Sequence, residues 1–319
     1  MRHKRIVVLG ICTVDMLARP IDSFPEPGGL RLFDELTTTT GGNAVNCAIA
    51  LAKLGIPARI VIKVGGDWMG RFILDELQRF GVDTTDVIRD EQGQTPFTFV
   101  CVRSDGERSF LHTMGTNATL RADEISADAF RDSDYVFATG AMLMETLDGT
   151  PLAGVLQQAR ASGALTILDT SFVSGRPQEE WCRAIEPCLP HADWFVPSRP
   201  EAQAITATPD PITMARALHS VGANGVVIKL DSEGVLLAER DAEPIWVPAL
   251  RVDRLIDATG AGDCWCAGFI AGISRGDNPV DAARIGNAVA AHCIQHVGAT
   301  AGIPQLGEVK PARGLPRLA

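Results

Sequence analysis

Short apolar runs rich in Val, Ile and Leu recur along the chain, and between them apolar and polar positions mix with a helical spacing. The run 6–10 ends in a glycine and predicts a buried strand. The Ala-rich segment 42–54 predicts a helix, because Gly55 stands just past its end as a C-terminal signal. The same pattern predicts further strands at 58–64, 135–138, 165–168, 194–196 and 226–230, and further helices ending at 79 or spanning 152–161 and 212–219.

Strands that alternate with helices predict a mainly parallel sheet with helices on both faces, in one domain over residues 1–319. Two stretches interrupt the alternation. The first, at about 16–37, is rich in Pro, Gly and Thr, and the second, at about 95–113, predicts a β-ribbon around the turn Asp105-Gly106. Because both follow early strands, we expect them to pair into a small β-sheet lid over one end of the main sheet.

Composition and charge narrow the function classes. The 319 residues are 46% hydrophobic and 21% charged, and 39 acidic against 29 basic residues give a net charge of −10. Such an acidic chain is a poor candidate for binding nucleic acid. No stretch approaches the roughly 18 uninterrupted apolar residues of a membrane span. The 8 cysteines are scattered without a disulfide or zinc spacing, which predicts a cytoplasmic protein. Together with the charge and the short apolar runs, the sequence predicts no nucleic-acid or membrane partner.

The segment 257–263 carries the strongest chemical signal. It reads Asp-Ala-Thr-Gly-Ala-Gly-Asp and opens an apolar helix that runs to about Ser274. Backbone N–H groups at a helix N-terminus bind anions, and glycines let the chain approach a phosphate closely. Asp263 is either a helix cap or an acid–base group, and capping alone does not require Gly-Ala-Gly before it.

Two familiar phosphate-binding loops are excluded. The P-loop pattern G-x-x-x-x-G-K-[ST] occurs nowhere in the chain. Trp265 stands where a dinucleotide fingerprint needs its third small residue, which disfavours a dehydrogenase. The loop at 257–263 therefore predicts a different phosphate chemistry.

Residues 257–263 resemble the second signature of the ribokinase-like (PfkB) carbohydrate kinase family, written D-T-x-G-A-G-D. Residues 41–46, Gly-Gly-Asn-Ala-Val-Asn, are similar to its first signature, and the resemblance covers roughly residues 5–304. It implies a ribokinase-like three-layer α/β/α sandwich with a mainly parallel central sheet and a small β-sheet lid, and ATP-dependent phosphorylation of an alcohol. The chain departs from the family at Ala258, usually Thr or Ser, and at Ser198, where the N-x-x-E motif has Asn.

The resemblance implies that Asp263 is the catalytic base. The backbone N–H groups of Gly260, Ala261 and Gly262 would hold the charge on the transferred phosphoryl group. A carboxylate can serve as this base because the proton leaves late in a loose phosphoryl-transfer transition state.

The resemblance also implies nucleotide and metal sites. The residues that would bind ATP are Ser198, Glu201, Lys229, Asp231, Gly234 and Asn287. Glu201 would orient the water shell of Mg²⁺, although by position alone it is also an ordinary first-turn glutamate, and Lys229 a strand-end charge. A monovalent cation, K⁺, would bind oxygens of Asp257, Thr259, Gly298 and Gly302.

For the acceptor, we expect Asp15 to follow a strand-end loop, where its carboxylate can bind two sugar hydroxyls or cap a turn. Asp169 stands at a predicted strand end, the edge at which parallel sheets bind ligands. By resemblance, the other residues of the acceptor pocket would be Gly41, Gly42, Asn43, Asn46 and Glu145.

The acceptor is expected to carry no phosphate, because the candidates for a cationic cluster near the lid are only Lys63, Arg103 and Arg108. A nucleoside would prefer stacking rings, which Phe33 and Phe110 could offer from the lid. We therefore predict an ATP-dependent kinase for a free sugar or sugar acid, of the ribose, fructose or 2-keto-3-deoxygluconate type. The alternatives are an adenosine- or inosine-type nucleoside kinase and a non-catalytic sugar or nucleotide sensor on the same fold. Because such lids often pair between subunits in this family, the resemblance also implies a homodimer through the β lid.

Overall fold

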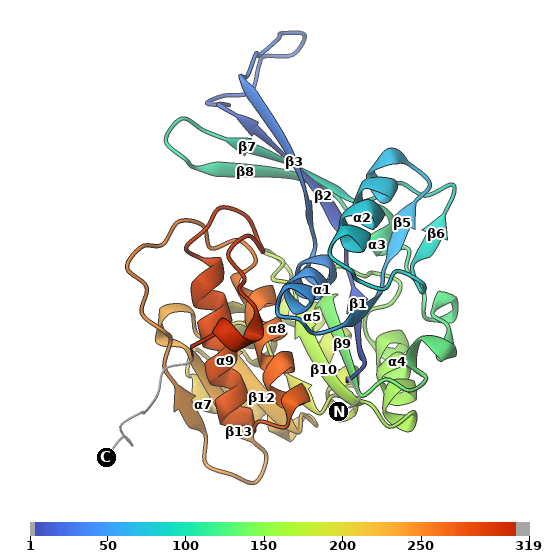
Figure 1. Cartoon of the computed structure of the whole chain (residues 1–319), viewed down its shortest axis with the longest axis vertical. Coiled ribbons are helices and arrows are strands. Elements are labelled where there is room, and N and C mark those ends of the chain that lie inside the picture. The colour runs from blue at the N-terminus through green and yellow to red at the C-terminus, as the bar shows by residue number, and fades with distance from the viewer. Residues whose placement is uncertain (1–3, 311–319) are drawn as a thin grey trace.

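The main sheet draws its strands from both halves of the chain (Figure 1). In the computed structural model, which describes residues 4–310, its eight strands run in the order β14-β13-β12-β11-β10-β9-β1-β4. Neighbouring strands from β12 to β4 are parallel, and β13 and β14 add antiparallel pairs at one edge. The bounds are β1 (Ile6–Gly10), β4 (Ala58–Val61), β9 (Tyr135–Ala141), β10 (Leu165–Thr170), β11 (Trp194–Phe195), β12 (Gly225–Lys229), β13 (Val235–Glu239) and β14 (Ile245–Val247).

The central strands are apolar on both faces because helices cover both sides of the sheet. Along β1, Ile6 and Val8 belong to one buried cluster, and Val7 and Leu9 belong to the other. This burial explains the uninterrupted apolar runs of the sequence. The helices that contribute to the first cluster are α1 (Asn43–Lys53), α2 (Trp68–Arg79), α8 (Ala261–Arg275) and α9 (Pro279–Cys293). Those of the second cluster are α4 (Thr150–Ala161), α5 (Gln178–Ile185), α6 (Arg199–Thr206) and α7 (Pro211–Ser220).

A separate sheet of four strands, which we name the lid sheet, projects beyond one end of the main sheet in the described part of the chain (Figure 1). Its order is β3 (Glu35–Gly41), β2 (Thr13–Arg19), β7 (Phe97–Val102) and β8 (Arg108–Thr113). β2 pairs parallel with β7, and the other two pairings are antiparallel. The short helix α3 (Gly115–Ala118) follows β8. The predicted mainly parallel α/β fold with a small separate sheet is confirmed.

The predicted strand 58–64 is wrong as a single element. Its first part, β4, joins the main sheet, whereas β5 (Lys63–Gly65) leaves that sheet and pairs parallel with β6 (Ile88–Asp90). All residues from Ile60 to Val64 are buried, so the burial pattern does not change where the chain changes partners.

The N-terminal ends of α1 and α8 meet at the end of the main sheet that faces the lid sheet (Figure 1). In open parallel sheets, the carboxyl ends of strands are where ligands bind. The helices of residues 4–310 all fall short of the length and apolar character that crossing a lipid bilayer requires.

Candidate active site

Asp263 lies buried in the first turn of α8, with 7% of its surface exposed. Two amides from the start of α1 point at it. The Nδ2 of Asn43 donates to Oδ1 over 2.9 Å, and the Nδ2 of Asn46 donates to Oδ2 over 2.8 Å. Both carboxylate oxygens are therefore held as acceptors, which fixes the orientation of Asp263.

Burial raises the pKa of Asp263 from its ordinary 3.8 to about 6. The hydrogen bond from Asn46, the charge of Lys229 and the hydrogen bond from Asn43 each act in the opposite direction, whereas the charge of Glu201 adds to the rise. A carboxylate with this pKa is ionised at neutral pH and is more basic than an ordinary aspartate. The geometry thus suits proton acceptance at neutral pH.

No motif of the sequence singles out Ser171, which follows the last residue of β10. Its Oγ donates to the Oδ1 of Asn43 over 2.8 Å. An amide whose oxygen accepts this bond turns its Nδ2 toward Asp263, so Ser171 fixes the orientation of Asn43. Its position just past a parallel strand was the one signal in the sequence that could have found it.

Lys229 and Asp169 form an ion pair at the carboxyl ends of β12 and β10. The Nζ of Lys229 lies 2.9 and 3.0 Å from the two oxygens of Asp169, which is 1% exposed. Burial opposes the charge of Lys229, but the nearby negative groups, chiefly Asp169, raise its pKa. The ammonium also lies 3.8 Å from where a Cβ on Gly262 would be, so it stands beside the first turn of α8.

Glu201 is buried in the first turn of α6, where its Oε2 accepts the N–H of Ser198 over 2.5 Å. Burial, followed by the charge of Asp169, raises the pKa of Glu201. The carboxylates of Glu201, Asp169 and Asp263 interact with the same cation, Lys229. This cluster has an excess of negative charge when all three are ionised. No group of three His, Cys, Asp or Glu side chains within residues 4–310 is placed to hold a metal ion by itself.

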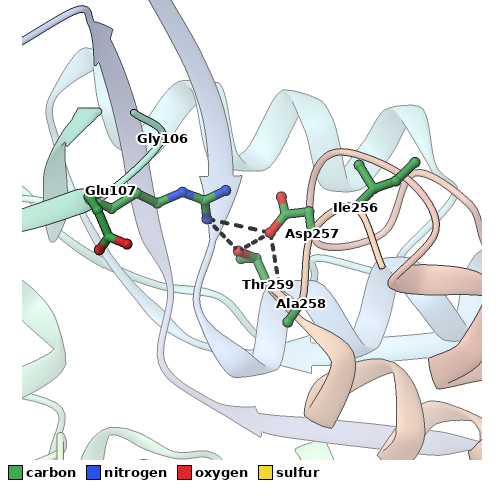
Figure 2. A pocket seen from close by; sticks show the side chains of 7 residues that line it. Gly106, Glu107, Ile256, Asp257, Ala258 and Thr259 are labelled. Carbon is green, nitrogen blue, oxygen red and sulfur yellow. Dashed lines mark hydrogen bonds and ion pairs between the residues drawn. The ribbon is translucent and has the colours of Figure 1, made fainter. Parts of the chain in front are cut away.

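Arg108 of β8 ties the lid sheet to the loop before α8 through two hydrogen bonds. Figure 2 shows the two side chains that accept them, Asp257 and Thr259, in that loop. The Nη1 of Arg108 donates to Thr259 Oγ1 over 3.1 Å and to Asp257 Oδ1 over 3.4 Å. Asp257 also accepts from the backbone and hydroxyl of Thr259, at 3.0 and 2.7 Å, and from the N–H of Gly298 at 3.0 Å. Burial by itself would raise the pKa of Asp257, but the hydrogen bonds together lower it below its ordinary value. Arg108, Asp257 and Thr259 line a pocket of about 370 Å³ between the lid sheet and this loop.

The loop itself depends on Gly260, the N-cap of α8. Its φ is 75°, and a Cβ there would lie 2.5 Å from the Cβ of Ala299. Only glycine fits both the left-handed backbone and this contact. The N–H of Ala261 donates to the carbonyl of Ala258 over 3.2 Å, so its predicted role toward a phosphate would require that bond to break.

Asp15 follows the loop at the end of β1, as predicted, but it lies inside the next strand, β2. The strand forms because Val14 is buried in the core while Asp15 points to the other side, which is the period of a pleated strand. Its carboxylate lies so close to Gly41 that any side chain there would overlap Oδ2. Burial raises the pKa of Asp15, against hydrogen bonds from Thr98 and Thr13. Through its contact with Gly41, Asp15 lies near the start of α1. Asn43, two residues after Gly41, is the residue that contacts Asp263.

Comparison with known proteins decides the family. Residues 3–306 match the family described as pfkB family carbohydrate kinase. The chain belongs to the pfkB family of carbohydrate kinases. This kinase is 33% identical over 258 residues to an uncharacterized sugar kinase of Archaeoglobus fulgidus, a match that covers 81% of this chain and 99% of the relative. It is 32% identical over 292 residues to the 2-dehydro-3-deoxygluconokinase of Bacillus subtilis, covering 88% of each chain.

Solved structures agree on the fold of the kinase. The ribokinase of Thermotoga maritima is 25% identical with a TM-score of 0.81, over 95% of this chain and 97% of that one. The ribokinase of Arabidopsis thaliana, at 24% identity, has a TM-score of 0.84 over 96% and 97% of the two chains. The ribokinase-like fold predicted from the two signatures is confirmed.

Several predicted site residues of the kinase do not converge on Asp263. Glu145 is exposed in the loop after β9 and interacts with Asp148 and Arg176. Asp231 and Gly234 form the turn between β12 and β13, where the N–H of Gly234 donates to the Asp231 carbonyl over 3.1 Å. Their roles toward substrates stay predictions.

Asn287 of the kinase uses its whole amide internally. Its Oδ1 accepts from Trp265 Nε1 over 2.8 Å, and its Nδ2 donates to the carbonyls of Val247 and Pro248 over 3.1 and 2.8 Å. It therefore joins α9, α8 and the end of β14, and its nucleotide contact stays a prediction. Gly302 packs against the carbonyl of His292, 2.6 Å from where its Cβ would be.

Proposed function

We propose that this kinase transfers the γ-phosphate of ATP to a hydroxyl of a free sugar or sugar acid, with Asp263 as the general base. The observation that carries the proposal is the setting of Asp263. It is a buried carboxylate with a pKa of about 6, held by Asn43 and Asn46, directly after the loop Gly260-Ala261-Gly262. This arrangement places a base beside an anion-binding helix terminus, as phosphorylation of an alcohol requires.

In the proposed reaction, Asp263 accepts the proton of the acceptor hydroxyl as that oxygen attacks the γ-phosphorus. The bond between the γ-phosphorus and the β,γ-bridging oxygen breaks, and ADP leaves. Asn43 and Asn46 aim the carboxylate, and Ser171 aims Asn43. Gly260 and Gly262 offer backbone N–H groups at the start of α8, where the helix dipole favours negative charge. Lys229 adds a buried positive charge beside the same turn.

The carboxylate cluster fits Mg²⁺. Glu201, Asp169 and Asp263 together carry more negative charge than Lys229 neutralises, and hard oxygen ligands are those that Mg²⁺ prefers. Because the described residues do not converge into a metal cage, Glu201 would hold the ion through water and the phosphates would complete its shell. When bound, the ion neutralises charge that develops on the phosphates.

The proposed binding site for K⁺ consists of oxygens of Asp257, Thr259, Gly298 and Gly302. The hydrogen bond from the Gly298 N–H to Asp257 supports the proposal, because it joins the two loops that would supply the oxygens. A cation there would also compete with Arg108 for Asp257.

Two other functions stay open to test. Phe110 in the lid is 62% exposed and could stack on a base, which favours the nucleoside alternative, whereas the ring of Phe33 already packs against Phe99. A relative from Methanothermobacter thermautotrophicus is a nucleoside kinase, 26% identical over 294 residues, covering 90% of this chain and 89% of the relative. The non-catalytic sensor is disfavoured because a sensor has no need for a buried base.

We also propose that two copies pair through the lid sheet. Apolar side chains are exposed on and beside it, which a second lid would cover. They are Phe24, Leu30, Leu32, Leu36, Phe110 and Leu111. Sedimentation of wild type and Phe110→Asp tests this, and a wild-type monomer at micromolar concentration would contradict it. A cytoplasmic location is proposed from the eight cysteines, which are all free thiols.

The test of the kinase function is ADP release from Mg-ATP across free sugars, sugar acids and nucleosides, with and without K⁺. Asp263→Ala should lower kcat at least about 10²-fold, the usual contribution of a general base. Asp241→Ala, at an exposed carboxylate in the turn after β13, is the matched control and should behave as wild type. If no acceptor supports turnover although the folded protein binds ATP, the sensor becomes the better reading.

A further inference from the structure

The lid sheet carries a line of polar side chains across all four strands. Strand register places Asp15 of β2 opposite Thr39 of β3 and Thr98 of β7. It also places Thr98 opposite His112 of β8. Residues directly opposite in neighbouring strands share a face of the sheet. This line, which we name the polar row, consists of Thr39, Asp15, Thr98 and His112.

Hydrogen bonds connect the polar row. The Nδ1 of His112 lies 3.1 Å from Thr98 Oγ1, which lies 3.4 Å from Thr13 Oγ1. Both hydroxyls also interact with the carboxylate of Asp15. Partial burial lowers the pKa of His112, which favours the neutral form of its ring. With Nδ1 engaged, the Nε2 of His112 has no partner among residues 4–310 and is available to a ligand hydroxyl.

Asp15 brings the polar row close to Asp263, the proposed base. The carboxylate of Asp15 lies against Gly41, and two residues later Asn43 donates to Asp263. A molecule that contacts both Asp15 and Asp263 has room to continue along the polar row toward His112 only past Asp15 and Thr98, which lie next in the row. The row offers hydroxyls, a neutral imidazole and one carboxylate, which together suit several sugar hydroxyls.

The charges of this region do not suit an acceptor that carries its own carboxylate. Such a group would meet Asp15 and Asp263, and Lys229 is already paired with Asp169 at 2.9 Å. Three other cations near the lid are also paired with carboxylates, whereas Arg31, in the loop between β2 and β3, donates to the hydroxyl of Ser23. The pairs are Lys63 with Glu124 at 2.7 Å, Arg103 with Asp105 at 3.2 Å and Arg108 with Asp257 at 3.4 Å.

Building on the proposed sugar-kinase function, we propose that the polar row is the specificity surface for the acceptor and selects an uncharged polyhydroxyl sugar over the corresponding sugar acid. Asp15 and the Nε2 of His112 bind hydroxyls remote from the one that is phosphorylated. Thr98 positions both of them, since it lies between them in the row.

The test measures acceptor binding by titration calorimetry without ATP, so that it does not depend on turnover. The matched probes are 3-deoxy-D-fructose and 2-dehydro-3-deoxy-D-gluconate, which differ only in a hydroxymethyl group against a carboxylate. D-Ribose and D-ribonate form a second pair, in which the carboxylate also removes the sugar ring. His112→Leu removes the ring nitrogens, and His112→Gln keeps a polar group near the position of Nε2. His191→Leu, outside the lid sheet, is the matched control. Circular dichroism and the affinity for ATP report whether each variant is folded.

We expect at least one neutral probe to bind about tenfold more tightly than its acid, and His112→Leu to weaken that binding about tenfold, the size of one lost hydrogen bond in a ligand site. His112→Gln should restore most of it, and Asp15→Asn should narrow the ratio between neutral and acid. The proposal is overturned if the acids bind as tightly as the neutral sugars, if no probe binds, or if folded His112→Leu binds as wild type. Neutral-sugar binding that is lost in His112→Leu, but gives no ADP release when ATP is added, would refute the kinase function and leave the specificity surface standing.

Discussion

The hydrogen bond from Asn46 to Asp263 makes a prediction about pH that can be sized from the structure. Replacing Asn46 with Ala removes a donor that lies 2.8 Å from Oδ2 and leaves Asn43 on Oδ1. A net hydrogen bond to a charged group contributes about 1.5–3 kcal/mol, and one pKa unit corresponds to about 1.36 kcal/mol. The pKa of Asp263, about 6 in the wild type, should therefore rise by about one to two units in Asn46→Ala.

The assay is kcat/KM for the acceptor between pH 5 and 9. The base must be ionised to accept a proton, so activity falls as pH drops through its pKa. We expect the midpoint of this acid limb at about 6 in the wild type and at about 7–8 in Asn46→Ala. Loss of a direct contact between Asn46 and the substrate would lower the whole curve without moving its midpoint. Asn224→Ala, which removes a side-chain hydrogen bond to the carbonyl of Ala192, is the control and should keep the wild-type midpoint.

Thermal unfolding gives a second measurement that needs no substrate. The folded-state pKa of Asp263 lies above the ordinary 3.8, so its ionisation costs stability as pH rises through that interval. Removing Asn46 increases the stability that is lost when Asp263 ionises. The full loss is reached only at a pH above the new pKa of Asp263. The difference in Tm between variant and wild type should therefore be larger at pH 8 than at pH 5. An acid limb that stays in place or moves to lower pH, with a constant Tm difference, would refute the assignment of Asp263 as the titrating base.

Three further predictions concern residues that position the reacting groups. Ser171→Ala should lower kcat about two- to tenfold, because Asn43 loses the hydrogen bond that orients its amide, and one such bond contributes about 0.5–1.5 kcal/mol. Ser171→Thr should restore kcat, and unchanged steady-state kinetics in the Ala variant would contradict this role of Ser171. Gly260→Ala should lower Tm by at least about 2–4 °C in calorimetry, because alanine in this left-handed backbone conformation costs about 1 kcal/mol. The overlap of its Cβ with Ala299 adds to that cost, and a Tm equal to that of the wild type would show that the loop adapts. Arg108→Ala should barely change Tm, because Arg108 is 37% exposed and the buried Asp257 keeps its hydrogen bonds from Thr259 and Gly298. It should nevertheless lower kcat/KM for ATP about 10²-fold if the charge of Arg108 reaches the transferred group. A lower Tm with unchanged ATP kinetics would show instead that Arg108 only fastens the lid.

The local features of the site could be predicted from the sequence. The segment 257–263 needs glycine for its backbone, begins a helix and ends in a carboxylate, and all three properties are set within a few residues. The alternation of apolar runs and helical segments likewise gave the mainly parallel sheet, because burial on both faces leaves a continuous apolar run. The same reasoning failed at β5, where burial continues although the strand pairs with β6 outside the main sheet.

Contacts between distant segments were decided only by the tertiary structure. The sequence places Asp169 and Lys229 at strand ends, but their ion pair depends on β10 and β12 lying on either side of β11. Ser171 gains its role only through the amide of Asn43, 128 positions away.

The polar row shows the same division. Thr98 and His112 are unremarkable in the sequence, and they line up with Asp15 because of the register in which β2, β7 and β8 pair. Backbone conformation and burial are local properties that a short segment can specify. Strand order and register are settled by packing of the whole chain, since a shift of one residue would turn each of these side chains to the opposite face.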